Sequence, residues 1–266
     1  MDSIKFADSH CHLNYDGLIE NSSDIINRMR KANVDIALNV CTTLEESADV
    51  LEMALKNNFI VASVGVHPDY EGIEEPTINS LVRRANNCKI AAIGETGLDY
   101  YRLKGDLSWQ RERFRTHIRA AREIGKPLII HTRSAQEDTM RILTEEKADE
   151  VGGVMHCFTE NLEMAKKSID LNFLISLSGI VTFKNAKQVQ EVAKKIALKN
   201  LMIETDSPFL APVPFRGKIN EPAYVVNVAK KIAEIKSDSL ENVAKVTRSN
   251  FIKFIGNSFS SLDVKK

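Results

Sequence analysis

Phe6-Ala-Asp-Ser-His-Cys-His-Leu13 is the stretch of sequence from which the fold and the site can be read. A short, mostly apolar run from Ile4 to Ala7 leads into His10 and His12. Residues two apart on an extended segment point the same way, so both imidazoles can face one spot. Two convergent imidazoles suit a divalent metal. A His-x-His pair alone is more often two ordinary histidines, so the interpretation depends on where the other histidines and carboxylates fall.

The composition describes a chain with enough apolar residues for one large core or two small ones, and with no net charge. Its 266 residues are 43% hydrophobic, and 36 Lys and Arg balance 36 Asp and Glu. A neutral total argues against a protein that coats nucleic acid through one broad basic face, although it permits a local basic groove. The first residues lack the apolar segment of a signal peptide, and no stretch approaches the roughly 20 apolar residues of a membrane span.

Cysteine usage indicates a reducing compartment. The four cysteines have no C-x-x-C spacing, and each ends or adjoins an apolar run: Cys11, Cys41, Cys88 and Cys157. Buried thiols are therefore favoured over disulfides. We expect a cytoplasmic protein with no membrane association and with no stable protein partner, that is, a monomer.

Short apolar runs alternate along the chain with longer amphipathic segments. Most of the runs are almost continuously hydrophobic, which is typical of parallel strands covered on both faces. The eight expected strands are Ile4–Ala7, Val34–Val40, Ile60–Val66, Ile90–Gly94, Leu128–Ile130, Gly153–Met155, Phe173–Leu177 and Leu201–Ile203.

The segments between these runs have helical spacing and recognisable ends. Thr43 opens a Thr-x-x-Glu capping box, and Gly125 is placed to end a helix that Pro127 could not continue. Ser134 and Asn161 stand where N-caps are expected. Residues 237–255 predict one or two closing helices.

Eight strand–helix units predict an α/β fold, a (β/α)8 barrel of TIM type, as a single domain over residues 1–257 with a polar, frayed tail at 258–266. A doubly wound open sheet is the rival fold. The first expected strand is not followed by a Gly-x-Gly-x-x-Gly turn, so a dinucleotide site is unsupported.

Ionisable side chains follow most of the expected strands. In a barrel these strand ends meet at one mouth, where catalytic groups collect. The residues at strand ends are His10, His12, His67, Glu95, His131, His156 and Asp206, whereas His117 falls within a helix and is expected to be structural or exposed. Any one of them could be an ordinary core or loop residue, but burying all seven unpaired would be costly, and a metal would offset that cost.

The residue types favour two ions. His10, His12 and Asp206 could hold a first ion, and His131 and His156 a second, with Glu95 bridging them. Mixed imidazole and carboxylate ligands suit Zn, Mn, Ni or Fe, and Mg is compatible with a carboxylate-rich and water-rich site. Two ions roughly 3.5–4 Å apart can activate a water and stabilise the attacking and leaving oxygens, with Asp206 as a candidate base. The reaction class that follows is metal-assisted hydrolysis.

The same residues lie in motifs that cover the chain almost end to end. They are Asp8-Ser-His-Cys-His-Leu13, Gly65-Val-His-Pro68, Gly94-Glu-Thr-Gly-Leu-Asp-Tyr-Tyr-Arg102, Ile130-His-Thr-Arg-Ser-Ala135, Met155-His-Cys-Phe158, Ser178-Gly-Ile-Val-Thr-Phe183, Glu204-Thr-Asp-Ser-Pro-Phe-Leu-Ala-Pro212 and Arg216-Gly-Lys-Ile-Asn-Glu-Pro222. In this order they resemble the TatD family of metal-dependent deoxyribonucleases, within the amidohydrolase-like barrels.

The resemblance implies a barrel, two divalent ions such as Mg, Mn or Zn, and hydrolysis of DNA phosphodiesters. The metal ligands it implies are His10, His12, Glu95, His131, His156 and Asp206. It also implies that His67 lies beside the metals and touches the scissile phosphate. Glu95 and Asp206 would then serve in catalysis as well as in metal binding.

Loops at the expected mouth carry cations and aromatic rings, which suit an unpaired nucleotide strand. The candidate contacts are His67, Arg133, Arg216, Tyr100 and Phe183, and an Arg fork such as that of Arg216 fits a phosphate well. The sequence departs from the family at Phe215, where a histidine or tyrosine is expected. These contacts predict an exonuclease that prefers single-stranded ends.

Two other functions use the same residues. One is amide or ester hydrolysis by a lactonase, a dihydroorotase-like amidohydrolase or a D-aminoacyl-tRNA deacylase, an activity with which the family has been linked. Enzymes of the wider group that use a carbamylated lysine need Lys at the fourth strand end, where Glu95 stands. The other is a non-catalytic metal-containing scaffold, which the full ligand set and the candidate base disfavour.

Overall fold

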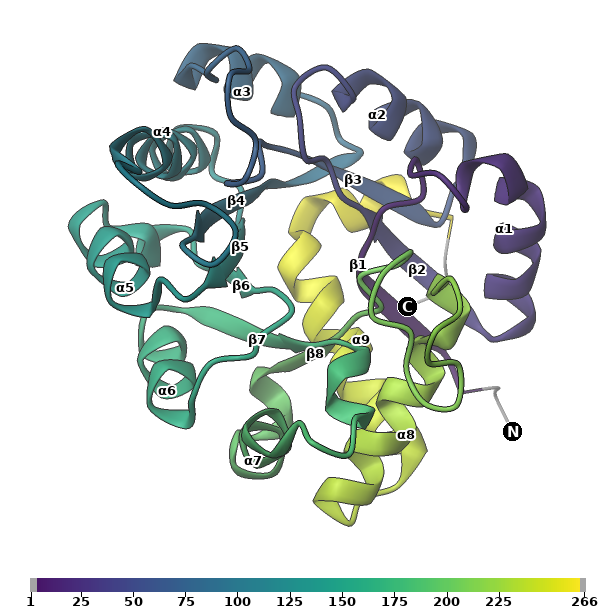
Figure 1. Ribbon diagram of the computed structural model, residues 1–266. Coiled ribbons are helices and arrows are strands. Elements are labelled where there is room, and N and C mark those ends of the chain that lie inside the picture. Colours follow the sequence, from purple (N-terminus) through teal and green to yellow (C-terminus); the bar gives the residue numbers. More distant parts are fainter. Residues whose placement is uncertain (1–3, 264–266) are drawn as a thin grey trace.

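The chain forms a (β/α)8 barrel, and the computed structural model describes residues 4–263 (Figure 1). Its strands are parallel and pair in sequence order around one sheet, as the alternating pattern predicted. The strands are β1 (Phe6–Cys11), β2 (Val34–Asn39), β3 (Ile60–Val64), β4 (Ile90–Asp99), β5 (Leu128–Arg133), β6 (Gly153–Met155), β7 (Phe173–Leu177) and β8 (Leu201–Ile203).

Helices surround the sheet, and their apolar faces pack against it. The α-helices are α1 (Ser22–Lys31), α2 (Ser47–Lys56), α3 (Ile78–Ala85), α4 (Ser108–Ile124), α5 (Gln136–Glu145), α6 (Leu162–Asp170), α7 (Lys187–Lys195), α8 (Val225–Lys236) and α9 (Leu240–Ile255). Short 3-10 helices are η1 (Ile19–Asn21), η2 (Ala148–Glu150), η3 (Gly179–Thr182), η4 (Leu198–Asn200), η5 (Pro222–Tyr224) and η6 (Gly256–Ser261).

The barrel closes where the chain leaves β1 and β8. The Asp206 amide donates to the His10 carbonyl over 2.9 Å, and the His12 amide donates to the Ser207 carbonyl over 2.8 Å. These two bonds lie at the carboxyl ends of the strands. They bring the first histidine motif and the Glu204–Asp206 segment together, although nearly 200 residues separate them in the sequence.

α9 plugs the opposite end of the barrel. Its Phe251 and Phe254 pack with apolar strand residues such as Leu38 and Ile129 in one buried cluster, and α9 crosses behind the strands in Figure 1. Phe259 of η6 joins this cluster and is 9% exposed. The expected frayed tail from residue 258 is therefore wrong up to Ser261, because the aromatic ring anchors it. Residues 264–266 lie outside the described part of the chain.

Three strands run further than their apolar sequence predicted. β1 continues through Asp8 to Cys11, β4 extends to Asp99 and β5 to Arg133. Every residue of β4 is buried, including the polar ones. Sheet pairing shifts register between Ile93 and Thr96, so Glu95 sits in an irregular part of β4 rather than after it.

Three of the four expected helix signals agree with the structure. Gly125 ends α4 in the left-handed conformation, and the Asn161 side chain accepts from the Met164 amide at the start of α6. Thr43 forms its reciprocal box with Glu46, although α2 begins only after it. Ser134 is not an N-cap, because its φ of 55° places it in a left-handed turn before α5.

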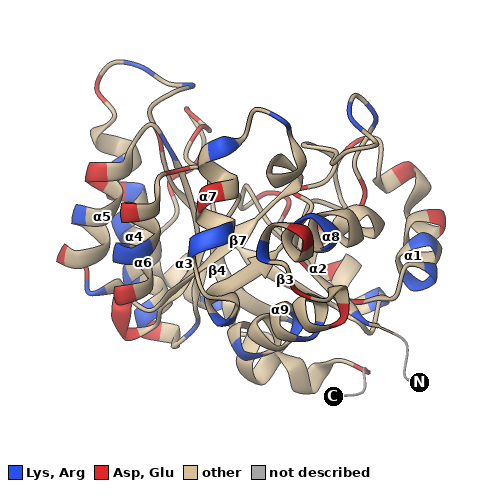
Figure 2. Cartoon of the chain, turned by 90° about the horizontal axis from the view of Figure 1, so that it is seen from below, with Lys and Arg blue, Asp and Glu red and all other residues tan. Residues whose placement is uncertain are grey.

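The molecule's surface mixes both signs of charge: Lys and Arg are interspersed with Asp and Glu over the helices (Figure 2). Among residues 4–263, no helix is long and apolar enough to cross a membrane. All four cysteines are free thiols. Cys11 and Cys41 are buried and Cys157 is partly buried, but Cys88 is exposed, which corrects the expectation that all four are buried.

Candidate metal centre

The six predicted metal ligands meet at the carboxyl end of the barrel. His10 lies in β1 and His12 just beyond it, Glu95 in β4 and His131 in β5, while His156 and Asp206 follow β6 and β8. The side chains of His10, His12, Glu95 and His156 are almost completely buried, and that of Asp206 is 15% exposed. The centre therefore draws on five strands or their ends.

One oxygen of Glu95 faces the residues predicted to hold a first ion. Glu95 Oε2 lies 3.2 Å from His10 Nε2 and 3.9 Å from His12 Nε2. Asp206 Oδ1 lies 3.7 Å and 3.5 Å from the same two nitrogens. The two Nε2 atoms are 3.2 Å apart. These four side chains direct their donor atoms to a common point.

The other oxygen of Glu95 faces a second group of imidazoles. Glu95 Oε1 lies 3.0 Å from His156 Nε2 and 3.2 Å from His131 Nδ1. His67 Nε2 is 3.3 Å from the same oxygen, so His67 belongs to this group by geometry. Because its two oxygens face different groups, Glu95 has the arrangement expected of a bridging carboxylate.

Charge at the centre favours a bound cation. Burial opposes ionisation of Glu95, but the charges of His156 and His67, together with the hydrogen bond to His10, outweigh it and hold the pKa of this carboxyl well below its usual value. Asp206 is similar: burial raises the pKa of its carboxyl, yet His12, His156 and His10 lower it overall. Two carboxylates thus remain anionic in a buried site.

The imidazoles respond to the same surroundings in different ways. Burial, helped by His156, lowers the pKa of His10, which keeps that ring in the neutral form that binds metals. Burial also disfavours charge on His156 and His67, but Glu95 overcomes it in both. The pKa of His156 rises well above its usual value and that of His67 rises to about 9. Positive charge is therefore stabilised beside Glu95 Oε1.

A second layer of hydrogen bonds fixes the ring orientations. His12 Nδ1 lies 3.2 Å from the Val40 carbonyl, and His131 Nε2 lies 3.1 Å from Asp99 Oδ2. Burial raises the pKa of Asp99, but the bond to His131 and backbone bonds lower it to about 2, so this partner is an anion. Such partners set which ring nitrogen is free to bind a metal.

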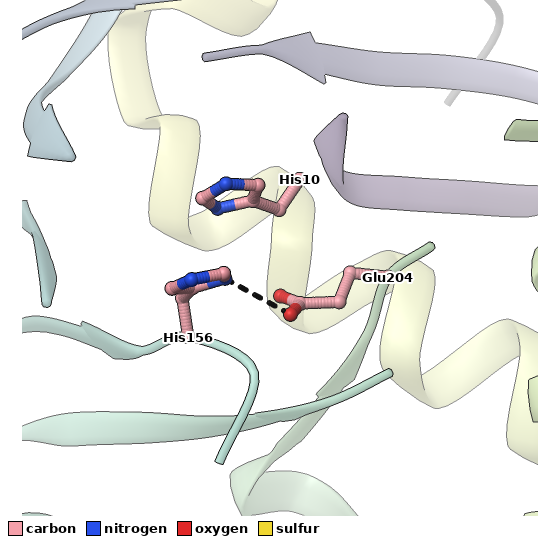
Figure 3. Close-up of side chains that lie close together, drawn as sticks. All are labelled: His10, His156 and Glu204. Atoms are coloured by element: carbon pink, nitrogen blue, oxygen red, sulfur yellow. Dashed lines mark hydrogen bonds and ion pairs between the residues drawn. The ribbon is translucent and has the colours of Figure 1, made fainter. Parts of the chain in front are cut away.

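Glu204 supplies the equivalent partner for His156 (Figure 3). Its Oε1 accepts from His156 Nδ1 over 3.0 Å and from the Cys157 amide over 2.7 Å. The His10 ring stacks on that of His156, with centroids 3.7 Å apart. Sequence analysis named Glu204 only as part of a motif; its place directly after an apolar strand is the signal that could have singled it out.

A cavity of about 510 Å³ opens over these groups. Two of the predicted substrate contacts, His67 and Arg133, line it. The other three lie outside its lining: the Tyr100 hydroxyl donates to Asp138, and Arg216 lies over the ring of Phe183. Although they lie outside the cavity, these three remain predicted substrate contacts.

Five further cavity residues were not among the predicted substrate contacts. They are Tyr15, Tyr70, Asp69, Arg102 and Phe209, which lie on loops after β1, β3, β4 and β8. Asp69 pairs with both His67 and Arg102, linking a cavity imidazole to an exposed guanidinium. Phe215, the residue that departs from the family pattern, stacks on Tyr224 with centroids 4.0 Å apart.

Comparisons with known proteins agree with this geometry. The family model described as TatD related DNase matches residues 7–256. The chain is 44% identical to the uncharacterized metal-dependent hydrolase YcfH of Escherichia coli K12, over 93% of this chain and 94% of that protein. It is 42% identical to the uncharacterized metal-dependent hydrolase YabD of Bacillus subtilis, over 91% of this chain and 96% of that one.

Solved structures show the same fold. The crystal structure of YjjV, a TatD homologue from Escherichia coli K12, matches with a TM-score of 0.87 and 25% identity, covering 94% of this chain and 98% of that one. A hydrolase of the TatD family from Entamoeba histolytica matches with a TM-score of 0.83 at 21% identity, over 96% and 99% of the two chains, and supports the fold alone.

Proposed function

This chain belongs to the TatD family, and from that premise we propose that it is a metal-dependent hydrolase that cleaves DNA phosphodiester bonds from single-stranded ends. The observation that carries the proposal is Glu95, whose two oxygens face two separate groups of donor atoms at the floor of one cavity. Two-ion sites of this kind serve the hydrolysis of phosphate esters.

The donor set fits two divalent ions, for which Mg, Mn or Zn are the candidates. His10, His12 and Asp206 would hold the first, and His131 and His156 the second, with Glu95 shared between them. The fit rests on two observations. The carboxylates of Glu95 and Asp206 are buried and anionic, and imidazole nitrogens converge on them. Bound there, the ions would supply Lewis acidity and would lower the pKa of a water molecule to near neutrality.

The protein's own side chains would bind the phosphate and move protons. His67 lines the cavity with its Nε2 3.3 Å from Glu95 Oε1, so its imidazole is placed to contact a phosphate bound at the centre. Arg133 and Arg102 also line the cavity and offer guanidinium forks to phosphate oxygens. Asp206, kept anionic by His12, His156 and His10, is placed to accept a proton from the attacking water.

The depth of the centre supports a preference for free strand ends. Glu95 is 3% exposed and lies on the cavity floor, so a scissile phosphate has to enter the cavity to reach it. A phosphate in the middle of a duplex is held on the helix surface by its paired neighbours on both sides. A single-stranded end can leave that surface and enter the cavity.

A cytoplasmic, monomeric enzyme is part of the same proposal, and the free thiols support the location. All four cysteines are unpaired, and Cys11 and Cys41 are buried in the core. Such thiols persist in reducing compartments. DNA is the partner that the proposal requires.

A substrate panel tests the proposal. Purified protein loaded with Mg, Mn or Zn in separate reactions would be given end-labelled single strands, linear duplex, closed circular duplex and RNA, plus one ester and one amide. We expect cleavage of single-stranded DNA ends to exceed that of closed circular duplex by far. Glu95→Ala should abolish it, because both ions lose a shared ligand.

The same panel can contradict the proposal in three ways. Equal rates on linear and closed circular duplex would exclude attack at ends. Hydrolysis of the ester or amide without cleavage of DNA would make the chain an acyl or amide hydrolase. Nuclease activity that survives in pure Glu95→Ala protein would exclude the shared-carboxylate centre. Glu163→Gln, a change on the exposed face of α6, serves as the matched control.

A further inference from the structure

The metal cavity has an aromatic wall, formed by Tyr15 and Phe209, that neither the metal centre nor the barrel core accounts for. Tyr15 lies on the loop after β1 and Phe209 on the loop after β8, and both line the cavity. Phe209 is 52% exposed, which is unusual for so large an apolar ring beside charged groups. What sets Phe209 apart from other exposed apolar side chains is that it lines the cavity, where it is placed to contact a group that enters.

The wall is continuous with the metal centre. The Tyr15 ring stacks on the His12 imidazole, with centroids 4.7 Å apart and planes 22° from parallel. The Phe209 ring meets Tyr15 edge to face, at 6.1 Å and 83°, and meets His12 at 6.5 Å. A group held on the predicted metals at His12 would therefore have aromatic surface directly beside it.

Phe209 is held in place although it is exposed. Its amide donates to the Asp206 carbonyl over 3.0 Å, and its carbonyl accepts from Asn220 Nδ2 over 2.6 Å. The same Asn220 amide group donates to the Thr205 carbonyl over 2.8 Å, tying the loop to the metal-binding segment. Tyr15 is fixed by a bond of 2.7 Å between its hydroxyl and Thr42 Oγ1. A fixed aromatic surface loses little conformational entropy when a ligand stacks on it.

The other side of the cavity is cationic. In a barrel of eight strands in sequence order, β4 and β5 lie across from β8 and β1. Arg102 follows β4 and Arg133 ends β5, where its guanidinium lies 4.0 Å from the centre of the Tyr101 ring. The cavity thus has aromatic surface on one side, guanidinium groups on the other and metal-binding groups on its floor.

We propose that Phe209, backed by Tyr15, is the platform on which the base of the terminal nucleotide stacks while its phosphate lies on the metal centre. This inference rests on the proposed function and adds the part of the substrate that the centre recognises: a flat base at the end of an unpaired strand. Stacking of this kind tolerates every base, so the platform selects a free nucleotide end without selecting a sequence.

Cleavage of matched single strands, which differ only in whether the terminal nucleotide carries a base, tests the platform. Single strands of one sequence would carry either a normal or an abasic nucleotide at the 5′ end, and a second pair would differ in the same way at the 3′ end. For the end that is attacked, we expect the wild type to prefer the base by about 10- to 100-fold in kcat/KM. Phe209→Ala should reduce this preference to near unity, and Phe209→Trp should restore it.

Two controls separate stacking from damage to the loop. Val213→Ala removes another exposed apolar side chain from the same segment, 49% exposed and outside the cavity lining, and should leave the base preference unchanged. Metal content of each variant, measured by elemental analysis, should equal that of the wild type. A base preference in Phe209→Ala equal to that of the wild type would overturn the inference.

A binding experiment keeps the inference independent of nuclease activity. Metal-loaded protein would be titrated calorimetrically with dAMP and with 2-deoxyribose 5-phosphate, which lacks the base. We expect wild type to bind dAMP about 10-fold or more tightly than the sugar phosphate, and Phe209→Ala to bind both alike. If no oligonucleotide is cleaved but this preference depends on Phe209, the nuclease proposal fails and the platform stands. Equal wild-type affinity for both ligands overturns the platform.

Discussion

Glu204 shows how a residue outside the cavity can determine what a metal ligand does. Its Oε1 accepts from both His156 Nδ1 and the Cys157 amide, which leaves His156 Nε2 directed at Glu95. Glu204 Oε2 and His10 Nδ1 are buried and have no hydrogen-bond partner within residues 4–263. A buried carboxylate that accepts from His156 Nδ1 raises the electron density that the other nitrogen of this ring can offer a cation.

Replacing Glu204 with Gln should therefore weaken metal binding without removing a ligand. The amide can still accept from His156, but it carries no charge. We expect an affinity loss of about 10- to 100-fold, measured by titration of chelator-treated protein with Mn or Zn. Glu163→Gln is the control, because within residues 4–263 Glu163 pairs only with exposed Lys167. Unchanged affinity in Glu204→Gln would show that hydrogen bonding alone is sufficient.

His117 is the one histidine away from the centre, and the structure buries it. Its Nε2 accepts from the Val66 amide over 3.0 Å, and its Nδ1 lies 2.8 Å from the Arg113 carbonyl, which fixes the neutral ring with the hydrogen on Nδ1. Burial lowers the pKa of His117 to about 4, despite the bond to Arg113. The structural role expected from the sequence is consistent with these contacts; exposure is not.

This lowered pKa predicts acid destabilisation. Below pH 6.5 the unfolded chain binds a proton at His117 that the folded protein rejects, so stability falls as the pH drops from about 6.5 to about 4, by up to about 3 kcal/mol. His117→Gln removes the titration. Urea unfolding at several pH values should show the wild type losing more stability than the variant across this window. A constant difference between them from pH 7 to pH 4.5 would contradict the assignment.

At the scale of elements, the sequence predicted which runs are strands better than where they end. Apolar runs marked all eight strands, but the expected ends of β1, β4 and β5 came too early, at the first polar or charged residue after the apolar run. Asp8 and Asp99 are polar and lie inside strands, because Thr205 donates to Asp8 through its amide and hydroxyl, and Asp99 accepts from His131 and the following loop. Partners so distant in sequence are invisible until the barrel is closed.

The close approach of β4 and β5 depends on Gly97. Its φ is +139°, and a Cβ there would lie 2.0 Å from the His131 carbonyl oxygen. Gly97→Ala would force apart the two strands that carry Glu95 and His131. We expect a loss of at least about 2 kcal/mol in unfolding free energy, together with weaker metal binding.

Gly105→Ala is the matched control for this change. Gly105 also has positive φ, +94°, but a Cβ there meets nothing within 4 Å. It should cost about 1 kcal/mol from backbone strain alone and leave metal affinity unchanged. Equal effects of the two substitutions, in denaturant melts and metal titrations, would show that strain rather than strand separation determines the outcome.

For the whole molecule, convergence of the ligands follows from barrel closure, which the strand count predicted. The ligands could be predicted because each accompanies an apolar run whose carboxyl end must lie at the mouth. The surrounding surface could not, since loop conformations depend on local contacts. Thus Tyr100 turns toward Asp138 and away from the cavity, whereas Phe209, which lies in a quoted motif but was not predicted to contact substrate, lines it.

Because the ligands come from β1, β4, β5 and the segments after β6 and β8, bound metal should stabilise the entire barrel. One ion at 100 times its dissociation constant adds about 2.7 kcal/mol, and two independent ions add about twice that, or about 10–20 °C in Tm for a domain of this size. Removing metal with a chelator should lower Tm by that amount, and restoring it should reverse the change. Glu95→Gln should lose most of the metal-dependent increment, because both groups of donors share that side chain, while Glu163→Gln keeps it. Elemental analysis could show bound metal whose removal leaves Tm unchanged. In that case the metal does not join these strands, and the ions lie somewhere other than around Glu95.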